Sequence, residues 1–296
     1  MSATVTDVIP EGWEVRDTPA GHKIFYRDSD HSYWSEVSEK KPGKWTGVRA
    51  ARLAGISTVI APYAGDPDPL LRWAARLTRE GVAALAAEGM GLDDLDDMRA
   101  ALSWLQSADS IGHALTDATL SHDQERDRRA IQGTNVHKLS LEEMASGAVV
   151  PDYAAMTTEE KAYSEGIEDF WIENDPDPEH SETMVTDPDL RVCGRLDLIA
   201  TLRRGKYAGM RAQIDGKTSG FIPAKHHVQV AGYKHCAEVS GYGETDAEFI
   251  LKITPEGKYR LIPVHATADS FRLAVGVYRD MGRIDRLAGA DARAAA

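Results

Sequence analysis

The amino-acid sequence predicts a mixed α/β protein of the α+β type, in which a mixed central sheet is flanked by helices. The composition, with 42% hydrophobic and 27% charged residues over 296 positions, can bury a sizeable core. Strand-like runs cluster at 13–37 and again at 182–265, and helical patterns occupy much of the chain between them. A helical pattern at 223–241 interrupts the second group of strands, as is typical of a sheet covered by helices.

The N-terminal part predicts short strands and then helices. Its β-rich runs, separated by the turn-forming segments TPAG and DSD, are WEVRD, HKIFYRD and HSYWSEV. In the segment GISTVIAPY, Ser57 or Thr58 can cap a short apolar helix. We therefore expect an N-terminal accessory region over residues 1–129, made of a β-hairpin and a helical extension.

The middle of the chain predicts helices. Residues 68–89 carry a broad apolar face at helical spacing, and residues 91–108 repeat the pattern after an acidic first turn that suits the helix dipole. Residues 127–147 predict a segment that leads into a helix, a break at Gly133 and another helix that ends at Gly147.

A core over residues 130–290 is predicted to run helix, helix, three or four strands, helix, two strands, helix. The second helix begins with a Thr cap and an acid-rich first turn and ends before the loop DPDPEH. Its strand-like runs are ETMVTD, LRVCG, RLDLIATLR and MRAQIDGKT, followed after a helix by AEFILKIT and KYRLIPVH around the turn PEG. A final helix is expected from near Ala268, with a frayed tail at 291–296.

Several classes of protein are disfavoured. No run approaches the roughly 20 apolar residues that span a bilayer, and the N-terminus has neither the basic nor the apolar region of a secretory signal. Cys193 and Cys236 cannot build a disulfide framework or a four-thiolate metal site. We expect a reduced, cytoplasmic setting and no membrane partner.

The charge distribution is uneven. The chain has a formal net charge of -13, which argues against nucleic acid as a partner. Residues 186–265, however, carry 12 Lys and Arg against 9 Asp and Glu. The excess acid therefore lies outside the segment that holds the candidate chemistry.

Two carboxylates and a lysine form the main candidate site. Asp197 heads an apolar strand, where an unpaired carboxylate would be costly if buried. Asp215 and Lys217 are two apart on a predicted strand and so face the same way. Together the two carboxylates and the ammonium group can bind a divalent metal ion and a phosphate group. Taken singly, Asp197 is more often a strand-end carboxylate, and Asp215 with Lys217 a same-face ion pair worth about 0.2–1 kcal/mol.

Two helices add further candidates. Gln229 and Tyr233 are four residues apart on a predicted helix and share a face, which suits a site lining but also an ordinary amphipathic helix. His137 begins a helix after Gly133 and Thr134, a position where a histidine more often has only a structural role.

Together these residues resemble the PD-(D/E)xK nuclease superfamily, in its RecB-like and lambda-exonuclease-like branch. The resemblance covers residues 130–265 and rests on four motifs in the family's order. The matching residues are Gly133-Thr134-Asn135-Val136-His137, Gly194-Arg195-Leu196-Asp197, Asp215-Gly216-Lys217 and Gln229 through Tyr233. Such nucleases often carry a glutamate on the preceding strand, where this chain has Glu182. The N-terminal runs also look like leaders of phage-type exonucleases of this branch.

The resemblance implies a restriction-endonuclease-like core and a role for each residue. Asp197, Asp215 and Lys217 would be catalytic, with Lys217 positioning or activating the attacking water. One or two Mg²⁺ or Mn²⁺ ions would be held by His137, Asp197, Asp215 and the Gly216 carbonyl. The residues that would line the site or hold DNA are Gln229, Tyr233, Glu182, Arg195 and Thr218.

The chain departs from the family's pattern at three points. Gly216 stands where an apolar residue is usual, which makes the strand more flexible. The glutamate after His137 falls at Glu142 or Glu143. No GxxxxGK[ST] P-loop is present, so ATP-driven unwinding would need another protein.

Three functions from different classes follow. The first is a metal-dependent DNA exonuclease acting in phage-type recombination or DNA processing, in the host cytoplasm if it is phage-encoded. The second is an endonuclease, structure-specific nuclease or RNA nuclease of the same fold, and the third is a non-catalytic nucleic-acid-binding scaffold. Family resemblance suggests DNA and a single-strand annealing recombinase as partners, and it is compatible with a ring-shaped homo-oligomer.

Overall fold

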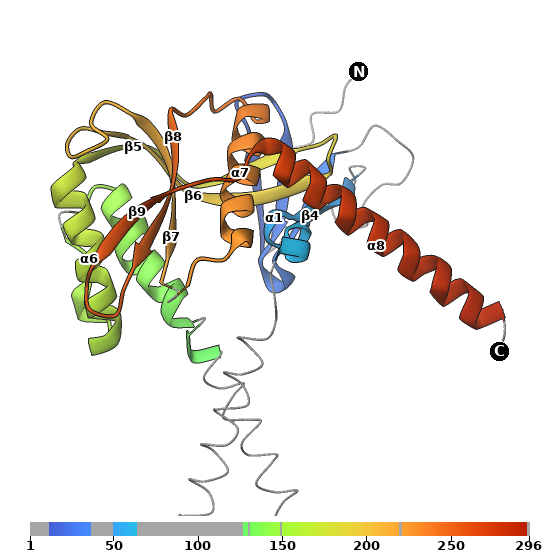
Figure 1. The fold of residues 1–296 in the computed structure, drawn as a ribbon, viewed down its shortest axis with the longest axis horizontal. Coiled ribbons are helices and arrows are strands. Elements are labelled where there is room, and N and C mark those ends of the chain that lie inside the picture. Colours follow the sequence, from blue (N-terminus) through green and yellow to red (C-terminus); the bar gives the residue numbers. More distant parts are fainter. Residues whose placement is uncertain are drawn as a thin grey trace, which may run out of the picture. The chain divides into compact units, whose positions relative to one another are not determined.

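The computed structural model describes residues 12–36, 50–63, 127–129, 131–148, 150–218 and 221–294. The chain divides into two compact units, one made of Met1–Gly65 with Val136–Ala296 and the other of Asp66–Asn135. The first unit holds a nine-stranded mixed sheet with helices packed on it, so the predicted mixed α/β class is confirmed (Figure 1). The helices predicted at 68–89 and 91–108 lie outside the described residues.

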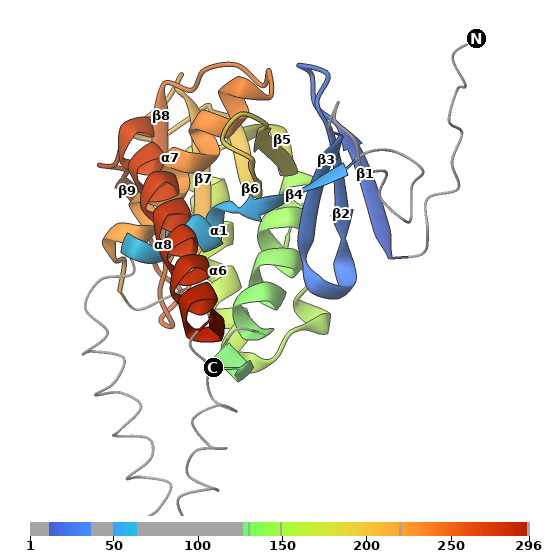
Figure 2. The same cartoon turned by 90° about the vertical axis from the view of Figure 1, so that its right-hand side faces the viewer.

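The N-terminal strands are part of this sheet. The antiparallel strands β1 (Trp13–Asp17), β2 (Lys23–Arg27) and β3 (Ser32–Glu36) confirm the three predicted runs. Strand β4 (Ala50–Gly55) pairs with β3 and then runs parallel to the start of β6, as Figure 2 shows. The predicted hairpin is therefore a four-stranded extension that is hydrogen-bonded into the central sheet.

The remaining strands follow in the order that the sequence predicts. They are β5 (Pro176–Asp187), β6 (Val192–Leu202), β7 (Arg211–Lys217), β8 (Ala247–Ile253) and β9 (Tyr259–Pro263). Along the sheet the order is β1-β2-β3-β4-β6-β7-β8-β9, and β5 pairs with β6. Two pairs, β4 with β6 and β7 with β8, are parallel, and the others are antiparallel.

Two strand predictions are wrong in their limits. The runs LRVCG and RLDLIATLR form one strand, because Gly194 keeps its place in the ladder opposite Val185. The predicted loop DPDPEH begins β5, with a register irregularity between Pro178 and His180. Among the described strands β5 pairs only with β6, so its other edge makes no hydrogen bonds to a strand. Proline, which has no N–H to donate, is therefore tolerated in β5.

The helices cover both faces of the sheet. α6 (Thr158–Asn174) packs in one hydrophobic cluster with β7 and β8, while α7 (Ala224–Val239) and α8 (Ala268–Ala294) pack in another with β5 and β6 (Figure 1). The predicted Thr cap of α6 is confirmed, because Thr157 and Glu160 form a capping box.

Three helix ends differ from expectation. Residues 131–136 are helical, so no break occurs at Gly133, and the π-helix η3 (His137–Glu142) and α5 (Glu143–Ala145) follow directly. α1 (Ile56–Val59) starts before Ser57, with Gly55 at its N-cap and no side-chain cap. α8 stays helical to Ala294 rather than fraying from 291. The predicted end at Gly147 is confirmed by its positive φ of 101°.

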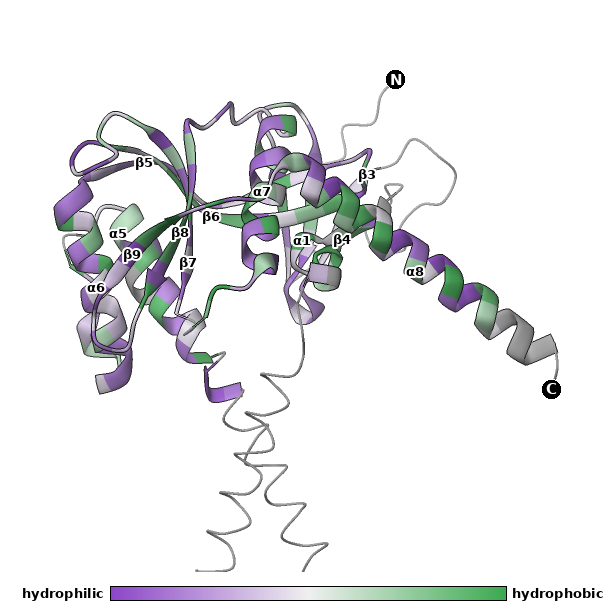
Figure 3. Ribbon diagram, in the orientation of Figure 1, coloured by the Kyte–Doolittle hydropathy of each residue, from purple (hydrophilic) through white to green (hydrophobic). Residues whose placement is uncertain are grey.

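Hydropathy follows this layering. The strands in the middle of the sheet are hydrophobic, whereas the coloured part of α8 alternates between hydrophobic and hydrophilic residues (Figure 3). Several apolar side chains of α8 are exposed, namely Leu273, Val277, Met281, Ile284 and Leu287. Only its first turns, through Phe271 and Val275, enter the core.

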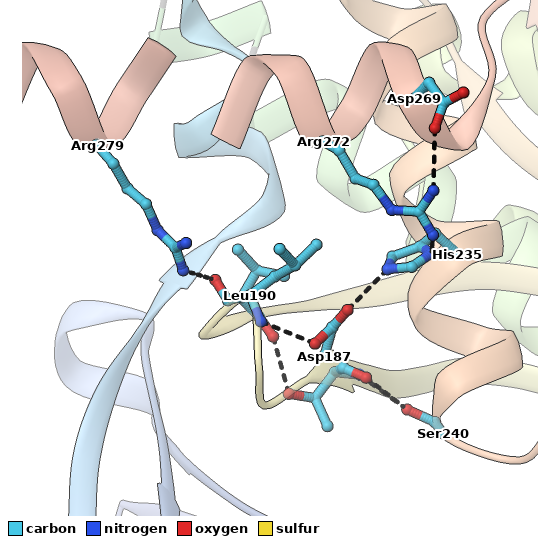
Figure 4. Close-up of polar contacts among 9 residues, drawn as sticks. Asp187, Leu190, His235, Ser240, Asp269, Arg272 and Arg279 are labelled. Atoms are coloured by element: carbon cyan, nitrogen blue, oxygen red, sulfur yellow. Dashed lines mark hydrogen bonds and ion pairs between the residues drawn. The ribbon is translucent and has the colours of Figure 1, made fainter. Parts of the chain in front are cut away.

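A buried polar network attaches the β5–β6 turn to the two C-terminal helices (Figure 4). Asp187 accepts a hydrogen bond from the Leu190 N–H at 2.8 Å, and its other oxygen lies 2.7 Å from His235 Nε2 on α7. Ser240 bonds the backbone of Thr186, and Arg279 of α8 donates to the Leu190 carbonyl. This turn leads directly into β6, so the network positions the strand that carries Asp197.

We predict that Asp187→Ala destabilises the fold by about 1–3 kcal/mol, because it leaves His235 and the Leu190 N–H without their partner. Burial opposes ionisation of Asp187, but the His235 and backbone hydrogen bonds outweigh it and lower its pKa. This stabilisation is therefore present above the unfolded-state pKa of about 3.9 and is lost as the pH falls through the folded-state value. Urea unfolding at several pH values measures it. The exposed neighbour Asp189→Ala is the control, and equal stability of both variants would contradict the prediction.

Candidate metal centre

The site lies where β6 and β7 part. The two strands pair only from Leu198–Ile214 to Thr201–Arg211, while β7 continues along β8 as far as Lys217. Beyond the last pair, the Gly216 N–H donates to Asp197 Oδ2 at 2.8 Å. A carboxylate thus takes the place of the strand partner, which brings Asp197 beside the end of β7.

A histidine and two carboxylates converge at this point. His137 Nε2 lies 3.0 Å from Asp197 Oδ2, and His137 Nδ1 lies 3.2 Å from Glu182 Oε1. One ligand atom from each residue lies within 4.8 Å of the others. His137 starts the π-helical turn η3, a distortion often found at functional sites. We call His137, Glu182 and Asp197 the acidic cluster.

Glu182 has a strained backbone in the middle of β5. Its φ is +49°, a left-handed conformation that non-glycine residues adopt at a cost of order 1–3 kcal/mol. The flanking pairs Ser181–Leu198 and Thr183–Leu196 place Glu182 opposite Asp197. Like charges directly opposite one another destabilise a sheet. Both features work against folding, so they point to a function for the cluster.

Asp215 and Lys217 share a face, as the sequence predicts. Lys217 Nζ lies 2.5 Å from Asp215 Oδ2, and the Asp215 side chain is only 2% exposed. Asp215 is not part of the three-residue cluster. The assignments of Asp215 and the Gly216 carbonyl as metal ligands stay predictions. Glu182, which was predicted only to line the site, is itself one of the three clustered candidate ligands.

The charges shift one another's pKa values. Burial opposes protonation of His137, but Asp197 and Glu182 outweigh it and raise its pKa to about 9. Burial raises the pKa of Glu182 to about 7 and that of Asp215 to about 6, although His137 and Lys217 respectively oppose these shifts. Burial also acts to raise the pKa of Asp197, but His137 and Lys217 outweigh it and hold this pKa below the usual value. The cluster therefore holds protons near neutral pH that a cation could replace.

The donor atoms fit a divalent cation. Asp215 Oδ1 makes no hydrogen bond with any residue that the structure describes, and His137 Nε2, Glu182 Oε1 and Asp215 Oδ2 have only the ion-pair contacts given above. Carboxylate oxygens suit Mg²⁺ and Mn²⁺, and an imidazole nitrogen suits the later transition metals as well. The set therefore fits a cation and does not single out Mg²⁺.

Gln229 and Tyr233 meet, as their spacing predicts. Gln229 Nε2 donates to the Tyr233 hydroxyl at 3.0 Å, and Tyr233 is buried. The Tyr233 ring packs on Gly194, where a Cβ would lie 2.6 Å from Tyr233 Cε1 and 3.0 Å from Ile56 Cδ1. The glycine of the G-x-x-D motif is thus needed so that α7 can approach β6.

The other predicted residues fall at the edges of the site. Arg195 lies 3.9 Å from Glu182 Oε2 and 3.0 Å from Glu14 Oε2, and Thr218 follows β7 with partial exposure. Gly133 and Thr134 belong to the second compact unit, outside the site's unit.

Two residues near the site were missed by sequence reasoning. Glu14 contacts the site only through its ion pair with Arg195. It lies on a strand far away in the sequence, so no local sequence pattern marks Glu14. His226 lies one turn before Gln229 on α7. Burial and the nearby Lys217 ammonium lower its pKa to about 4, so it is neutral at physiological pH. Its spacing of three from Gln229 could have identified it.

No protein-family model matches this chain, and no curated protein matches it either. Among the described residues, no helix is both long and apolar enough to cross a membrane.

We predict that Gly194→Ala costs about 1–3 kcal/mol, because the new methyl group must displace Tyr233 or Ile56 in a packed core. Urea unfolding measures the change. Gly276→Ala on α8 is the matched control: its Cβ would meet nothing within 4 Å, so it should be neutral or stabilising. If the two variants are equally stable, the close contact with Tyr233 is not a constraint.

We predict that Mn²⁺ binding strengthens as the pH rises from about 6 to about 9, because bound cation must displace the protons of Glu182 and His137. The window follows from their raised pKa values of about 7 and about 9. Calorimetry in buffers of different ionisation enthalpy measures the affinity and the protons released. Glu182→Gln should weaken both, while Glu179→Gln, on the same strand but paired with Arg211, should not. Affinity independent of pH would contradict the assignment.

Proposed function

We propose that this protein is a metal-dependent DNA exonuclease whose core is restriction-endonuclease-like, as in the PD-(D/E)xK superfamily. One observation carries the proposal: His137, Glu182 and Asp197 converge where β6 and β7 part, next to the Asp215–Lys217 pair. The sequence resemblance singles out His137, Asp197 and the Asp215–Lys217 pair from three separate motifs, and Glu182 from the strand before Gly194. A scaffold protein would have no use for a strained glutamate opposite an aspartate, which argues against the non-catalytic alternative.

The chain's own residues support hydrolysis of a phosphodiester. His137, Glu182 and Asp197 would hold a divalent cation, which lowers the pKa of bound water and offsets charge on the phosphate oxygens. Lys217 presents its ammonium beside Asp215, where it can orient the attacking water or stabilise the negative charge of the transition state. Burial opposes its charge, but Asp215 and Asp197 raise its pKa, so Lys217 is cationic and acts by position and charge.

DNA is the proposed substrate despite the acidic total charge. A cation on the acidic cluster would cancel part of the local repulsion toward a phosphate. Action in phage-type recombination beside a single-strand annealing recombinase, and assembly into a homo-oligomer, remain proposals from family resemblance. Exonuclease and endonuclease activity differ in their need for a DNA end, so closed-circular DNA resists only the former.

We predict that end-labelled linear DNA is degraded in Mg²⁺ or Mn²⁺, that EDTA stops the reaction, and that closed-circular DNA survives. Asp197→Ala should abolish cleavage, because it removes a ligand atom and the bond to Gly216. Lys217→Ala should lower the rate on the order of 10²-fold with binding retained, as for loss of a group that stabilises charge in the transition state.

The controls are ion pairs outside the cluster. Lys234 lies 2.6 Å from Glu248, and Asp177 lies 2.6 Å from Arg203. Lys234→Ala and Asp177→Ala should cleave like the wild type. Near wild-type cleavage by Asp197→Ala or Lys217→Ala would contradict the proposal. Cleavage of closed-circular DNA would instead indicate an endonuclease.

A further inference from the structure

A small cavity opens beside the acidic cluster, between the N-terminal strands and β6. Its volume is about 290 Å³, and its lining residues are Gly12, Trp13, Glu14, Tyr26, Asp28 and Arg195. Arg195 connects it to the cluster, since Arg195 lies two residues before Asp197 on β6 and 3.9 Å from Glu182 Oε2. A ligand in this cavity would therefore be a neighbour of the candidate metal centre.

The walls of the cavity suit a flat, aromatic ligand. The Arg195 guanidinium lies 5.2 Å above the Tyr26 ring, on the same face of the β1–β2 pair as Glu14. Trp13 pairs with Arg27, so its ring lies on the opposite face. The Tyr26 hydroxyl is bonded to His31 Nδ1 at 2.5 Å, which holds the ring in place. Aromatic rings and guanidinium planes are the surfaces on which nucleobases stack.

The charge of the cavity disfavours a phosphate. Arg195 is already paired with Glu14 at 3.0 Å, so its charge is largely neutralised. Asp28 adds a second, exposed carboxylate to the lining. Carboxylates accept hydrogen bonds from the exocyclic amino groups of bases, as from cytosine N4, but thymine has no such group.

We propose that this cavity holds a nucleobase of the strand being cut, next to the phosphodiester at the acidic cluster, and that it favours cytosine and adenine over thymine. This inference rests on the proposed nuclease function. The base stacks on the Arg195–Tyr26 pair, and Asp28 accepts a hydrogen bond from its amino group. Arg195 forms the wall between the base and the metal centre.

Binding of fluorescent dC, dA and dT oligonucleotides in Ca²⁺, which replaces Mg²⁺ without supporting cleavage, tests the proposal. Wild type should bind oligo-dC and oligo-dA more tightly than oligo-dT. Tyr26→Leu should weaken binding on the order of 10-fold, the usual effect of losing a stacking ring, whereas Trp13→Ala, on the opposite face of β1–β2, should not. Asp28→Ala, which removes the acceptor, should abolish the preference for dC and dA while leaving dT binding unchanged, and the exposed Asp17→Ala on β1 is its control.

Mn²⁺ titration without DNA and thermal unfolding show whether each variant keeps its fold and its metal centre. A folded Tyr26→Leu variant that binds all oligonucleotides like the wild type would overturn the cavity assignment while leaving the nuclease proposal standing. The same holds if wild type binds the three oligonucleotides equally. If wild type neither binds nor cleaves any DNA, the proposed function fails, and the base-binding cavity fails with it.

Discussion

The candidate site depends on the parting of β6 and β7 beyond the Leu198–Ile214 pair. A backbone N–H left without a strand partner is costly when buried, and here the Asp197 carboxylate accepts the bond from Gly216. The same hydrogen bond fixes the direction of Asp197 and brings it beside the end of β7. Because β7 still pairs with β8 to Lys217, the Asp215–Lys217 pair is held rigidly on one side of the gap.

Several features of the site oppose stability and are supported from outside it. Glu182 has a left-handed backbone opposite Asp197, and burial penalises the charge of both carboxylates. The surrounding strands β5 and β6 pair along nearly their whole length, and the Asp187–His235 network ties their turn to the C-terminal helices. Strained, like-charged groups persist in a fold when such surroundings hold them in place.

The N-terminal strands extend the site as well as the sheet. β4 reaches β6 through only two backbone pairs, but Arg195 then crosses from β6 to Glu14 and to the Tyr26 ring. On the opposite face Tyr233 packs on Gly194, so β6 is held from both sides within five residues of Asp197. The strand that carries the candidate ligand is thus among the most constrained parts of the described structure.

The sequence by itself determined the mixed α/β class, the order of strands and helices from 157 onward, and the local pairs Asp215–Lys217 and Gln229–Tyr233, because these follow from periodicity and from spacings of two and four. The tertiary structure alone decided which distant residues meet. Glu182 joins His137 because β5 pairs with β6 in one particular register, and Glu14 reaches Arg195 because β4 enters the sheet beside β6. Such non-local pairings depend on strand register and packing, which no short stretch of sequence encodes.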